Sequence, residues 1–265
     1  MGIFRFRKFE VRNEKSAMKV NTDGVLLGAL MRISGNWCRM LDIGTGTGTI
    51  ALMAAQRLSE AQASQRASER DKARRLSENG HGDMATEEGS FLIDAIDIDE
   101  ASAEEAAENF AASPWSGHLR AHCTPLSGFA PETDYNLIFS NPPFFTETLH
   151  SPSARKAVSR HADALPLEEI TSFAAAHLAP DGYLALILPS SREQEAEKTA
   201  AEYGLALTRV AEIHGSDRKP AYRVVMEFSR VHGKKTMVTR ENVTINMNGK
   251  YSEQYLSIVS DFLLI

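Results

Sequence analysis

Short apolar runs and helical segments alternate along most of the chain. Apolar runs of roughly four to eight residues predict buried strands, whereas apolar residues spaced three and four apart predict helices. The strands expected on this basis lie in 39–48, 91–96, 119–123, 135–140, 182–189, 207–213 and 221–228. The helices expected between them lie in 49–58, 100–112, 166–178 and 193–203. This order predicts an α/β fold with one doubly wound, mostly parallel seven-stranded sheet whose last strand is antiparallel.

The segments around this core predict an organisation in three parts. A central α/β domain is preceded by an arm with one helix and followed by a strand with a helix. The three parts span 1–38, 39–232 and 233–265. In the last part, apolar and polar residues alternate over 236–247, which predicts a terminal strand or hairpin. Residues 251–264 include apolar residues at helical spacing. We expect that small C-terminal extension to pack on the same domain.

Two further segments have a distinct pattern. Residues 1–12 alternate Phe and Val with Arg, which predicts a short strand or an extended arm. Thr22 or Asp23 is expected to cap a helix that runs to about Met31. Residues 59–90 are rich in Ala, Ser, Arg and Glu and poor in large apolar residues. They are predicted to form an insertion, with a helical extension to about residue 78 and then a mobile loop.

Composition and charge restrict the class of protein. Of the 265 residues, 43% are hydrophobic, which supports a sizeable core, and no apolar run is long enough to predict a membrane span. The N-terminus lacks the apolar region of a signal peptide. Cys38 and Cys123 lack CxxC spacing, which favours a reducing cytoplasm and argues against a thiolate metal site. The net charge of −6 excludes a uniformly basic nucleic-acid binder.

A glycine-rich turn follows the first strand. Gly44, Gly46 and Gly48 stand between that strand and the next helix, in the opening unit of a nucleotide-type α/β fold. Their spacing differs from the GxGxxG dinucleotide pattern, and no Gly-Lys-Ser/Thr follows, which excludes a P-loop. Asp97 ends the second strand. When the insertion 59–90 is left out of the count, Asp97 stands roughly 20 residues after the glycines. At this interval an acid meets the ribose hydroxyls of a bound nucleotide.

The segment from Asn141 to Phe144, Asn-Pro-Pro-Phe, follows the fourth strand. Its two prolines have a fixed φ and no N–H, so they hold a stiff, extended segment at the end of the strand. The Asn141 side-chain oxygen and the Pro142 carbonyl can accept the two N–H bonds of a flat group that carries an amino substituent. The ring of Phe144 can stack on that flat group. A strand-ending turn with a buried Phe is the alternative. The glycine turn and Asp97 favour the functional interpretation, because all three share the carboxyl edge of the sheet.

These motifs resemble those of a known group of enzymes. The stretch from Leu41 to Gly48 resembles the first motif of class I S-adenosylmethionine-dependent methyltransferases, and Asn141 to Phe144 resembles their amino-methylating fourth motif. Over nearly the whole chain, the sequence is similar to the bacterial tRNA1(Val) adenosine-N6-methyltransferase family. The segments that carry this resemblance are Ala17 to Gly28, Ser113 to Trp115, Asn141 to Phe145, Arg160-His161, Tyr251-Ser252 with Tyr255, and Asp261-Phe262.

The resemblance implies a fold, a reaction and a set of site residues. It implies a Rossmann-like methyltransferase that uses S-adenosylmethionine to methylate N6 of the adenosine beside the anticodon of a valine tRNA. The implied catalytic residues are Asn141, Pro142 and Phe144. Two acids are implied to bind the cofactor, Asp42 near its methionine amino group and Asp97 at its ribose. The glycines Gly44, Gly46 and Gly48 are implied to let the backbone approach the cofactor closely. Further candidates on the cofactor side are Lys19, Thr22 and Asp23. Residues 124–126 depart from the family, because many relatives carry an acid there near the cofactor adenine.

Basic clusters on this acidic chain are compatible with RNA binding and also with ordinary solvated surface. The RNA-binding residues predicted from them are Arg155, Lys156, Arg160, His161, Arg218, Lys219 and Arg223. We expect a tRNA substrate and a cytoplasmic protein that needs no metal, membrane or obligate protein partner.

Three alternatives stay open. The Asn-Pro-Pro-Phe segment recognises a planar amino group and no particular molecule, so a protein glutamine N5-methyltransferase and an rRNA guanine-N2 methyltransferase are also compatible with it. A non-catalytic RNA- or cofactor-binding domain of the same fold is the alternative from another class.

Overall fold

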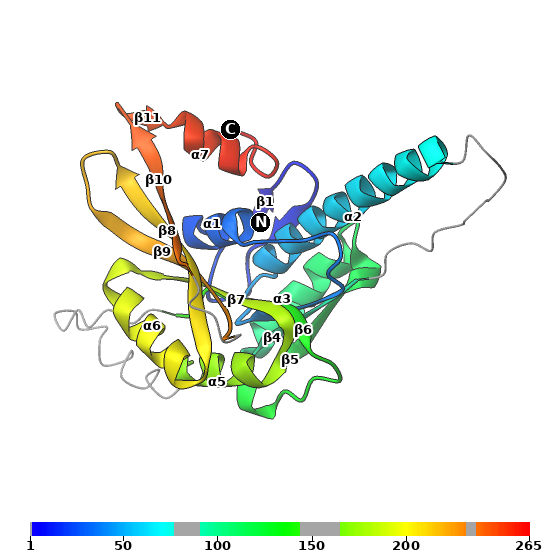
Figure 1. The fold of residues 1–265 in the computed structure, drawn as a ribbon, viewed down its shortest axis with the longest axis horizontal. Coiled ribbons are helices and arrows are strands. Elements are labelled where there is room, and N and C mark those ends of the chain that lie inside the picture. The colour runs from blue at the N-terminus through cyan, green and yellow to red at the C-terminus, as the bar shows by residue number, and fades with distance from the viewer. Residues whose placement is uncertain (1, 77–90, 144–164, 232–236) are drawn as a thin grey trace.

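A central sheet with helices on both sides forms the body of the molecule (Figure 1). The computed structural model describes residues 2–76, 91–143, 165–231 and 237–265. Within these ranges, nine strands form the main sheet in the order β11-β10-β8-β9-β7-β6-β3-β4-β5. Their bounds are β3 Arg39–Ile43, β4 Leu92–Asp97, β5 Leu119–Cys123, β6 Tyr135–Ser140, β7 Leu178–Pro189, β8 Leu205–Ser216, β9 Ala221–Arg230, β10 Thr239–Met247 and β11 Lys250–Tyr251.

The seven strands from β3 to β9 have the predicted topology. β3 lies between β4 and β6, and the sheet grows outward from it to β5 on one side and to β7 on the other. These neighbours are all parallel, whereas β9 lies antiparallel between β7 and β8. The prediction of an α/β, doubly wound sheet with an antiparallel last strand is therefore confirmed.

The predicted count of seven strands is wrong, because the C-terminal segment extends the sheet. β10 pairs parallel with β8, and β11 returns antiparallel on β10. Val243 and Ile245 alternate inward from β10 and join the core. The Gln254 side chain, from α7 (Glu253–Val259), accepts from the Thr244 N–H at 3.1 Å and donates to the Asn242 carbonyl at 2.7 Å. One amide side chain thus satisfies strand-edge groups of β10 that would otherwise be open.

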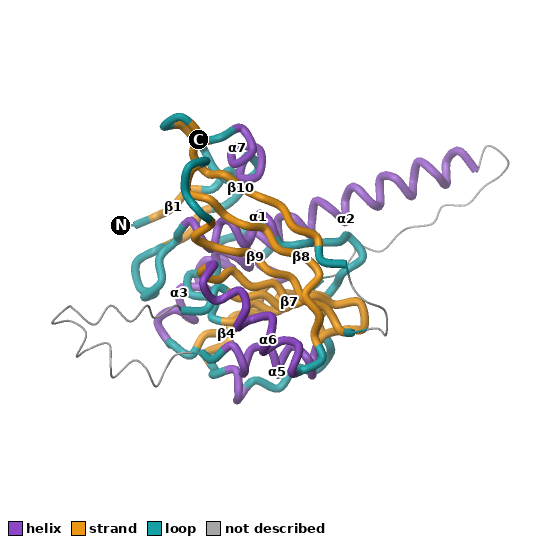
Figure 2. The backbone as a smooth tube through the Cα atoms, turned by 60° about the vertical axis from the view of Figure 1, so that its left-hand side comes forward, coloured by secondary structure: helices purple, strands orange, loops and turns teal. Residues whose placement is uncertain are grey.

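Helices cover both faces of the sheet (Figures 1 and 2), and an apolar core on each face holds them in place. One core contains side chains of α1, α2, α3 and α7, and the other contains side chains of α5 and α6. The remaining helix bounds are α1 Thr22–Leu30, α2 Thr49–Leu76, α3 Glu100–Ala111, α5 Leu167–His177 and α6 Glu193–Glu202. In β7, Leu186 faces one core and Ile187 the other, so the part of the strand from Leu184 to Leu188 is continuously apolar.

The long helix α2 leaves the sheet after its first turns (Figures 1 and 2). Its first residues, including Leu52, Met53 and Leu58, are fully buried, whereas the positions beyond Ala63 include many exposed ones. The helix continues to Leu76, close to the predicted end of the helical extension. The loop predicted at 79–82 lies outside the described residues.

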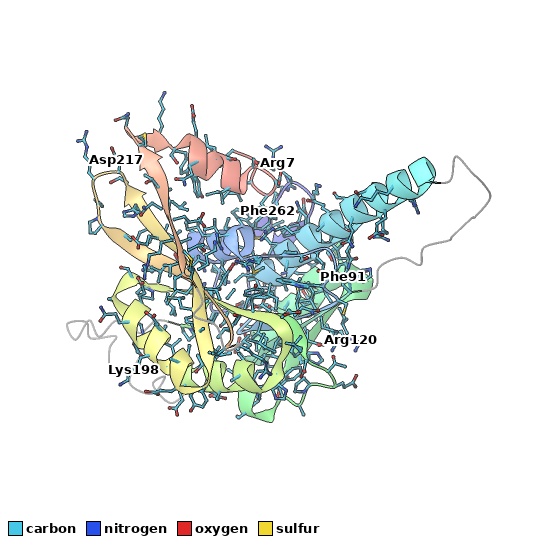
Figure 3. All side chains as sticks on the ribbon, in the orientation of Figure 1. Arg7, Phe91, Arg120, Lys198, Asp217 and Phe262 are labelled. Atoms are coloured by element: carbon cyan, nitrogen blue, oxygen red, sulfur yellow. The ribbon has the colours of Figure 1, made fainter. Side chains whose placement is uncertain are left out.

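The N-terminal arm forms a small hairpin. β1 (Ile3–Arg5) pairs antiparallel with β2 (Glu10–Arg12), and Phe6, Phe9 and Val11 are buried. Between the strands, the Arg7 N–H donates to the Phe262 carbonyl at 2.8 Å, and Arg7 Nε donates to the Leu263 carbonyl at 3.0 Å. Figure 3 shows Arg7 and Phe262 close together. The hairpin is thereby tied to the residues that follow α7.

Both ends of α1 are held by side chains. The predicted N-cap at Thr22 or Asp23 is wrong by one position, because the Asn21 side chain accepts the Gly24 N–H at 2.8 Å. At the other end, Arg57 Nη1 donates to the carbonyls of Gly28 at 2.8 Å and Met31 at 2.7 Å. Charge at the C-terminal end of the helix complements its macrodipole. Because Arg57 belongs to α2, the C-terminal end of α1 is tied to the helix that follows the glycine turn.

Candidate active site

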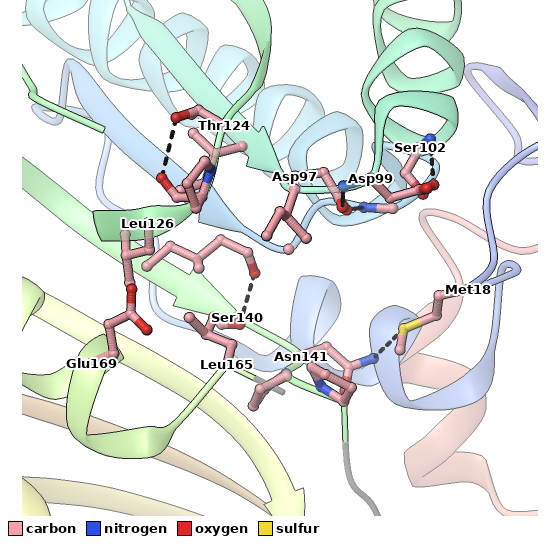
Figure 4. Close-up of a pocket in the computed structure, with 18 of the residues that line it drawn as sticks. Met18, Asp97, Asp99, Ser102, Thr124, Leu126, Ser140, Asn141, Leu165 and Glu169 are labelled. Carbon is pink, nitrogen blue, oxygen red and sulfur yellow. Dashed lines mark hydrogen bonds between the residues drawn. The ribbon is translucent and has the colours of Figure 1, made fainter. Parts of the chain in front are cut away.

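A cavity of about 360 Å³ opens where β3, β4, β5 and β6 end (Figure 4). The glycine turn, the tip of β4 and the segment after β6 all reach it, as the shared carboxyl edge of the strands requires. Its lining residues are Ala17, Met18, Ile43, Gly44, Gly46, Ile96 to Asp99, Ser102, Thr124 to Ser127, Ser140 to Pro143, Leu165 and Glu169. The three motifs singled out in the sequence therefore meet at one site.

The glycine turn is bonded to β4. The N–H groups of Gly44 and Thr45 both donate to the Ile96 carbonyl, at 2.9 and 3.0 Å. Gly44 and Gly46 have φ values of +72° and +57°, which only glycine adopts without strain. A Cβ added at Gly44 would meet nothing within 4 Å, so the backbone there is open to an incoming group.

Gly48 has a different surrounding from the other two glycines. Its φ is +78°, and a Cβ there would lie 2.5 Å from Cε1 of Phe110 in α3. Gly48 does not line the cavity. Its missing side chain lets α3 approach the turn, while the predicted contact of Gly48 with the cofactor stays a prediction.

Asp97 connects the tip of β4 to the turn. One carboxylate oxygen accepts the Gly46 N–H at 2.8 Å, and the other accepts the Asp99 N–H at 2.9 Å. Burial raises the pKa of Asp97 above its usual range, although these backbone hydrogen bonds act in the opposite direction. The carboxylate lines the cavity beside the two glycines, where its remaining lone pairs can accept hydroxyl groups.

Asp42 lies beneath the turn. It is fully buried, and its carboxylate accepts the Thr45 hydroxyl at 2.8 Å. Burial raises its pKa to about 7. Asp42 is not among the residues that line the cavity. Its observed contact holds the turn, and the expected contact with a methionine amino group stays a prediction.

Asn141 lines the cavity and has a buried acceptor that no described residue pairs. The residue is 6% exposed, and its side-chain oxygen has no hydrogen-bond partner within the described part of the chain. Its amide nitrogen lies 3.8 Å from the Met18 sulfur. The preceding Ser140 is fixed by its hydroxyl, which donates to the Ile43 carbonyl at 2.7 Å. Pro142 and Pro143 also line the cavity, whereas the predicted Phe144 lies outside the described residues.

Two of the three N-terminal residues predicted on the cofactor side, Lys19 and Asp23, are engaged within the protein. Lys19 lines a small hollow of about 20 Å³ next to the main cavity, and its ammonium donates to the Glu14 carbonyl at 2.7 Å. Thr22 and Asp23 line neither space. Asp23 accepts from Arg223 Nε at 2.8 Å. Their roles at the cofactor stay predictions.

Two of the basic residues predicted to bind RNA are exposed. Arg218 and Lys219 lie in the turn between β8 and β9, which leads to the carboxyl edge of the sheet. Arg223 is partly buried, pairs with Asp23 and has its guanidinium 5.2 Å from the ring centroid of Tyr222. The predicted RNA-binding residues Arg155, Lys156, Arg160 and His161 lie outside the described residues.

The chain is similar in sequence to several known proteins. No model of a protein family matches the chain. A protein of Pedobacter heparinus is 36% identical over 264 residues, which are 98% of this chain and 97% of that protein. A protein of Flavobacterium psychrophilum is 34% identical over 99% of both chains. A protein of Parabacteroides distasonis is 35% identical over 98% of this chain and 97% of that protein. All three are named tRNA1(Val) (adenine(37)-N6)-methyltransferase. The chain belongs to this family. The resemblance found in the sequence is thus confirmed.

A solved structure shares the fold of this family member. The crystal structure of a predicted O-methyltransferase from Agrobacterium tumefaciens has a TM-score of 0.61 and 15% identity, and it covers 91% of this chain and 96% of that chain. No helix among the described residues is both long and apolar enough for a membrane crossing. The described residues also contain no group of three or more His, Cys, Asp or Glu side chains arranged to hold a metal ion.

Several lining residues were missed in the sequence of this tRNA1(Val) (adenine(37)-N6)-methyltransferase family member. Met18 reaches the cavity from the segment before α1, and Leu126 reaches it from the turn after β5. Leu165 and Glu169 reach it from the start of α5, far from the other motifs in sequence. Position after a strand was the signal used for Asp97 and Asn141. That signal points to Leu126, but it cannot find residues that enter from a helix.

Proposed function

We propose that this chain transfers a methyl group from S-adenosylmethionine to the N6 amino group of an adenosine in tRNA. Following the name shared by its relatives, we assign this to position 37 of a valine tRNA. The single observation that carries the proposal is the Asn141 side-chain oxygen, which is buried at the cavity without a hydrogen-bond partner among the described residues. An unpaired buried acceptor costs about 1–3 kcal/mol and points to a ligand that donates to it.

The cavity is suited to S-adenosylmethionine. Gly44 and Gly46 offer open backbone at positive φ, and the Asp97 carboxylate beside them suits ribose hydroxyls. Ile98 and Leu126 also line the cavity, and their apolar side chains offer a surface on which a flat base can rest. When bound, this group supplies a methyl that is already activated on a sulfonium, so the protein contributes positioning and electrostatics.

The residues after β6 would hold the target amino group. Adenine N6 is a poor nucleophile, because its lone pair is delocalised into the ring. The Asn141 oxygen and the Pro142 carbonyl would accept its two N–H bonds and favour a pyramidal nitrogen whose lone pair is free to react. Phe144 would stack on the base, a contact worth about 1–3 kcal/mol. A base in an anticodon loop is already partly unstacked, which lowers the cost of bringing it to the site.

The tRNA itself is expected to meet the carboxyl edge of the sheet. The exposed Arg218 and Lys219 in the turn between β8 and β9 would contact phosphates there. Both cysteines are free and exposed, which is compatible with the reducing cytoplasm in which tRNA is modified. We therefore extend the proposal to a cytoplasmic enzyme that acts on tRNA.

A transcribed valine tRNA and a methyl-labelled donor test the proposal. We expect labelled N6-methyladenosine with the wild-type protein and none with Asn141→Ala. Asn36→Ala, an exposed asparagine outside the cavity, is the matched control and should keep full activity. Unchanged methylation by Asn141→Ala would overturn the mechanism. If the tRNA stays unlabelled in adenine, while parallel reactions with cell protein or rRNA as the acceptor place label in glutamine or in guanine N2, the alternatives of glutamine N5 or guanine N2 methylation are supported.

A further inference from the structure

Among the described residues, three carboxylates line the cavity, and two of them are engaged within the protein. Asp97 accepts the N–H groups of Gly46 and Asp99. Asp99 accepts the Ser102 N–H at 2.9 Å and its hydroxyl at 2.7 Å, which caps α3. Glu169 is the third, and within the described part of the chain its carboxylate has no hydrogen bond or ion pair. A carboxylate in a cavity without an internal partner is available for a ligand.

Glu169 lies at the end of the cavity opposite Asn141. In Figure 4, Glu169 and Leu126 are at one end, while Asn141 and Met18 are at the other. The first turn of α5, which carries Glu169, packs against the short turn Leu126–Gly128 after β5. Glu169 is therefore far from the group that Asn141 would hold. It is next to the turn where many relatives have an acid and this chain has none.

The surroundings of Glu169 are suited to a flat ring. Leu126 is buried, while Ile98, directly after Asp97, is 59% exposed although it is apolar. A base lying against Ile98 would cover this exposed side chain. The only hydroxyl side chain at position 124–126 is also engaged, since Thr124 Oγ1 donates to the Pro125 carbonyl at 3.2 Å. The edge of such a base would thus face the Glu169 carboxylate.

We infer that Glu169 binds the exocyclic amino group of the cofactor adenine and so replaces the acid missing after β5. This inference rests on the proposed function, because it requires the adenosyl group to bind in the cavity. A carboxylate only accepts hydrogen bonds, so it selects the amino group of adenine over the carbonyl of hypoxanthine. Glu169 thereby sets the specificity of the cofactor site.

Another explanation for an acid at this position is the helix itself. Acidic side chains in the first turn of a helix stabilise it through the macrodipole. Glu168 is in the same turn, but its carboxylate is exposed and accepts the Tyr203 hydroxyl at 2.7 Å. The Glu168→Gln variant removes the same charge from the same turn. It is therefore a matched control for Glu169→Gln.

Calorimetry with two nucleoside ligands tests the inference without any turnover. The ligands are S-adenosylhomocysteine and S-inosylhomocysteine, which differ at C6, an amino group against a carbonyl, and at N1, which has a hydrogen only in the inosine compound. The wild-type protein and Glu168→Gln should bind the adenosine compound about tenfold or more tightly than the inosine compound, as expected for a hydrogen bond to a charged group. Glu169→Gln should lose most of this preference, because its amide can donate to the inosine carbonyl. Glu169→Leu should weaken only binding of the adenosine compound.

The outcomes separate the inference from the proposed function. If the wild-type protein binds S-adenosylhomocysteine and Glu169→Gln keeps the wild-type preference, the inference is wrong while the proposed cofactor stands. If Glu168→Gln loses the preference as well, the effect belongs to the helix and the inference is again wrong. If the wild-type protein binds neither compound, the proposed function fails and the inference fails with it.

Discussion

The Asp97 carboxylate accepts the backbone N–H of Gly46 at 2.8 Å, across 51 positions of sequence. The same carboxylate accepts the Asp99 N–H with its second oxygen. One side chain therefore holds the glycine turn, fixes the tip of β4 and lines the cavity. A change at Asp97 should alter the shape of the site as well as its charge.

We expect Asp97→Asn to weaken binding of S-adenosylhomocysteine by at least about tenfold. An amide has one oxygen, so it would place an NH₂ group against one of the two N–H donors. Calorimetry measures this affinity directly. Equal affinities of wild-type protein and Asp97→Asn would show that the carboxylate has no part in cofactor binding.

The buried Asp42 should make stability depend on pH. Its pKa is about 7 in the folded protein and 3.8 for the free group. Between these values the unfolded chain has lost the proton while the folded chain keeps it, so the free energy of unfolding falls as pH rises toward 7. Each pKa unit corresponds to about 1.4 kcal/mol, so the loss is on the order of a few kcal/mol.

We expect Asp42→Asn to remove this loss, because an amide does not ionise in this pH range. Its oxygen can still accept the Thr45 hydroxyl, so the contact that holds the turn is kept. Urea unfolding at pH 5 and pH 8 should show a smaller fall in the free energy of unfolding for this variant than for the wild-type protein. Asp134→Asn, at an exposed position, should behave as the wild type does. An identical pH dependence of Asp42→Asn and wild type would contradict the assignment.

Gly48 and Gly204 allow a close steric comparison. Both have φ of +78°, but a Cβ at Gly48 would lie 2.5 Å from Phe110, while one at Gly204 would meet nothing within 4 Å. Gly204→Ala should cost about 1–2 kcal/mol from backbone strain alone. Gly48→Ala should cost a further 1–3 kcal/mol or so from overpacking. Equal losses in the free energy of unfolding would show that α3 moves away without cost.

The turn between β8 and β9 should contribute to the salt dependence of tRNA binding. Neutralising Arg218 and Lys219 together should reduce the slope of log affinity against log salt by about one to two. Lys198→Ala, on the exposed side of α6, is the control and should leave the slope unchanged. Arg223→Ala should change the slope less, because its guanidinium already pairs with Asp23. A slope unaffected by the double variant would remove this turn from the tRNA site.

The sequence predicted strands far better than it predicted which residues share a surface. β5 and β6 have the predicted bounds. β6 contains a short apolar run, Leu137 to Phe139, and β5 is a short segment in which Leu119 and Ala121 alternate with the polar Arg120 and His122. The cap of α1 was misplaced, since three suitable residues stand in a row and the choice depends on a partner: Asp23 pairs with Arg223, 200 positions away. A strand or hairpin was expected in 236–247, but its place in the main sheet was missed, because β10 gains its partner only when β8 is already in place.

The same limit applies at the site. Gly44 and Gly48 look alike in the motif, and only the position of Phe110 distinguishes their surroundings. Asn141 and Asp97 were found because they follow strands, and parallel strands bring such residues to one edge. Glu169 carries no such signal, because its place depends on how α5 packs against the turn after β5.

The unpaired oxygen of Asn141 has a consequence for engineering. A buried acceptor without a partner destabilises the ligand-free fold, so an apolar residue of similar size, as in Asn141→Leu, should raise the melting temperature while it abolishes methyl transfer. Selection of variants for heat resistance alone would therefore favour inactive protein. A thermostable form of this enzyme has to be sought at positions outside the cavity, with catalysis monitored at every round.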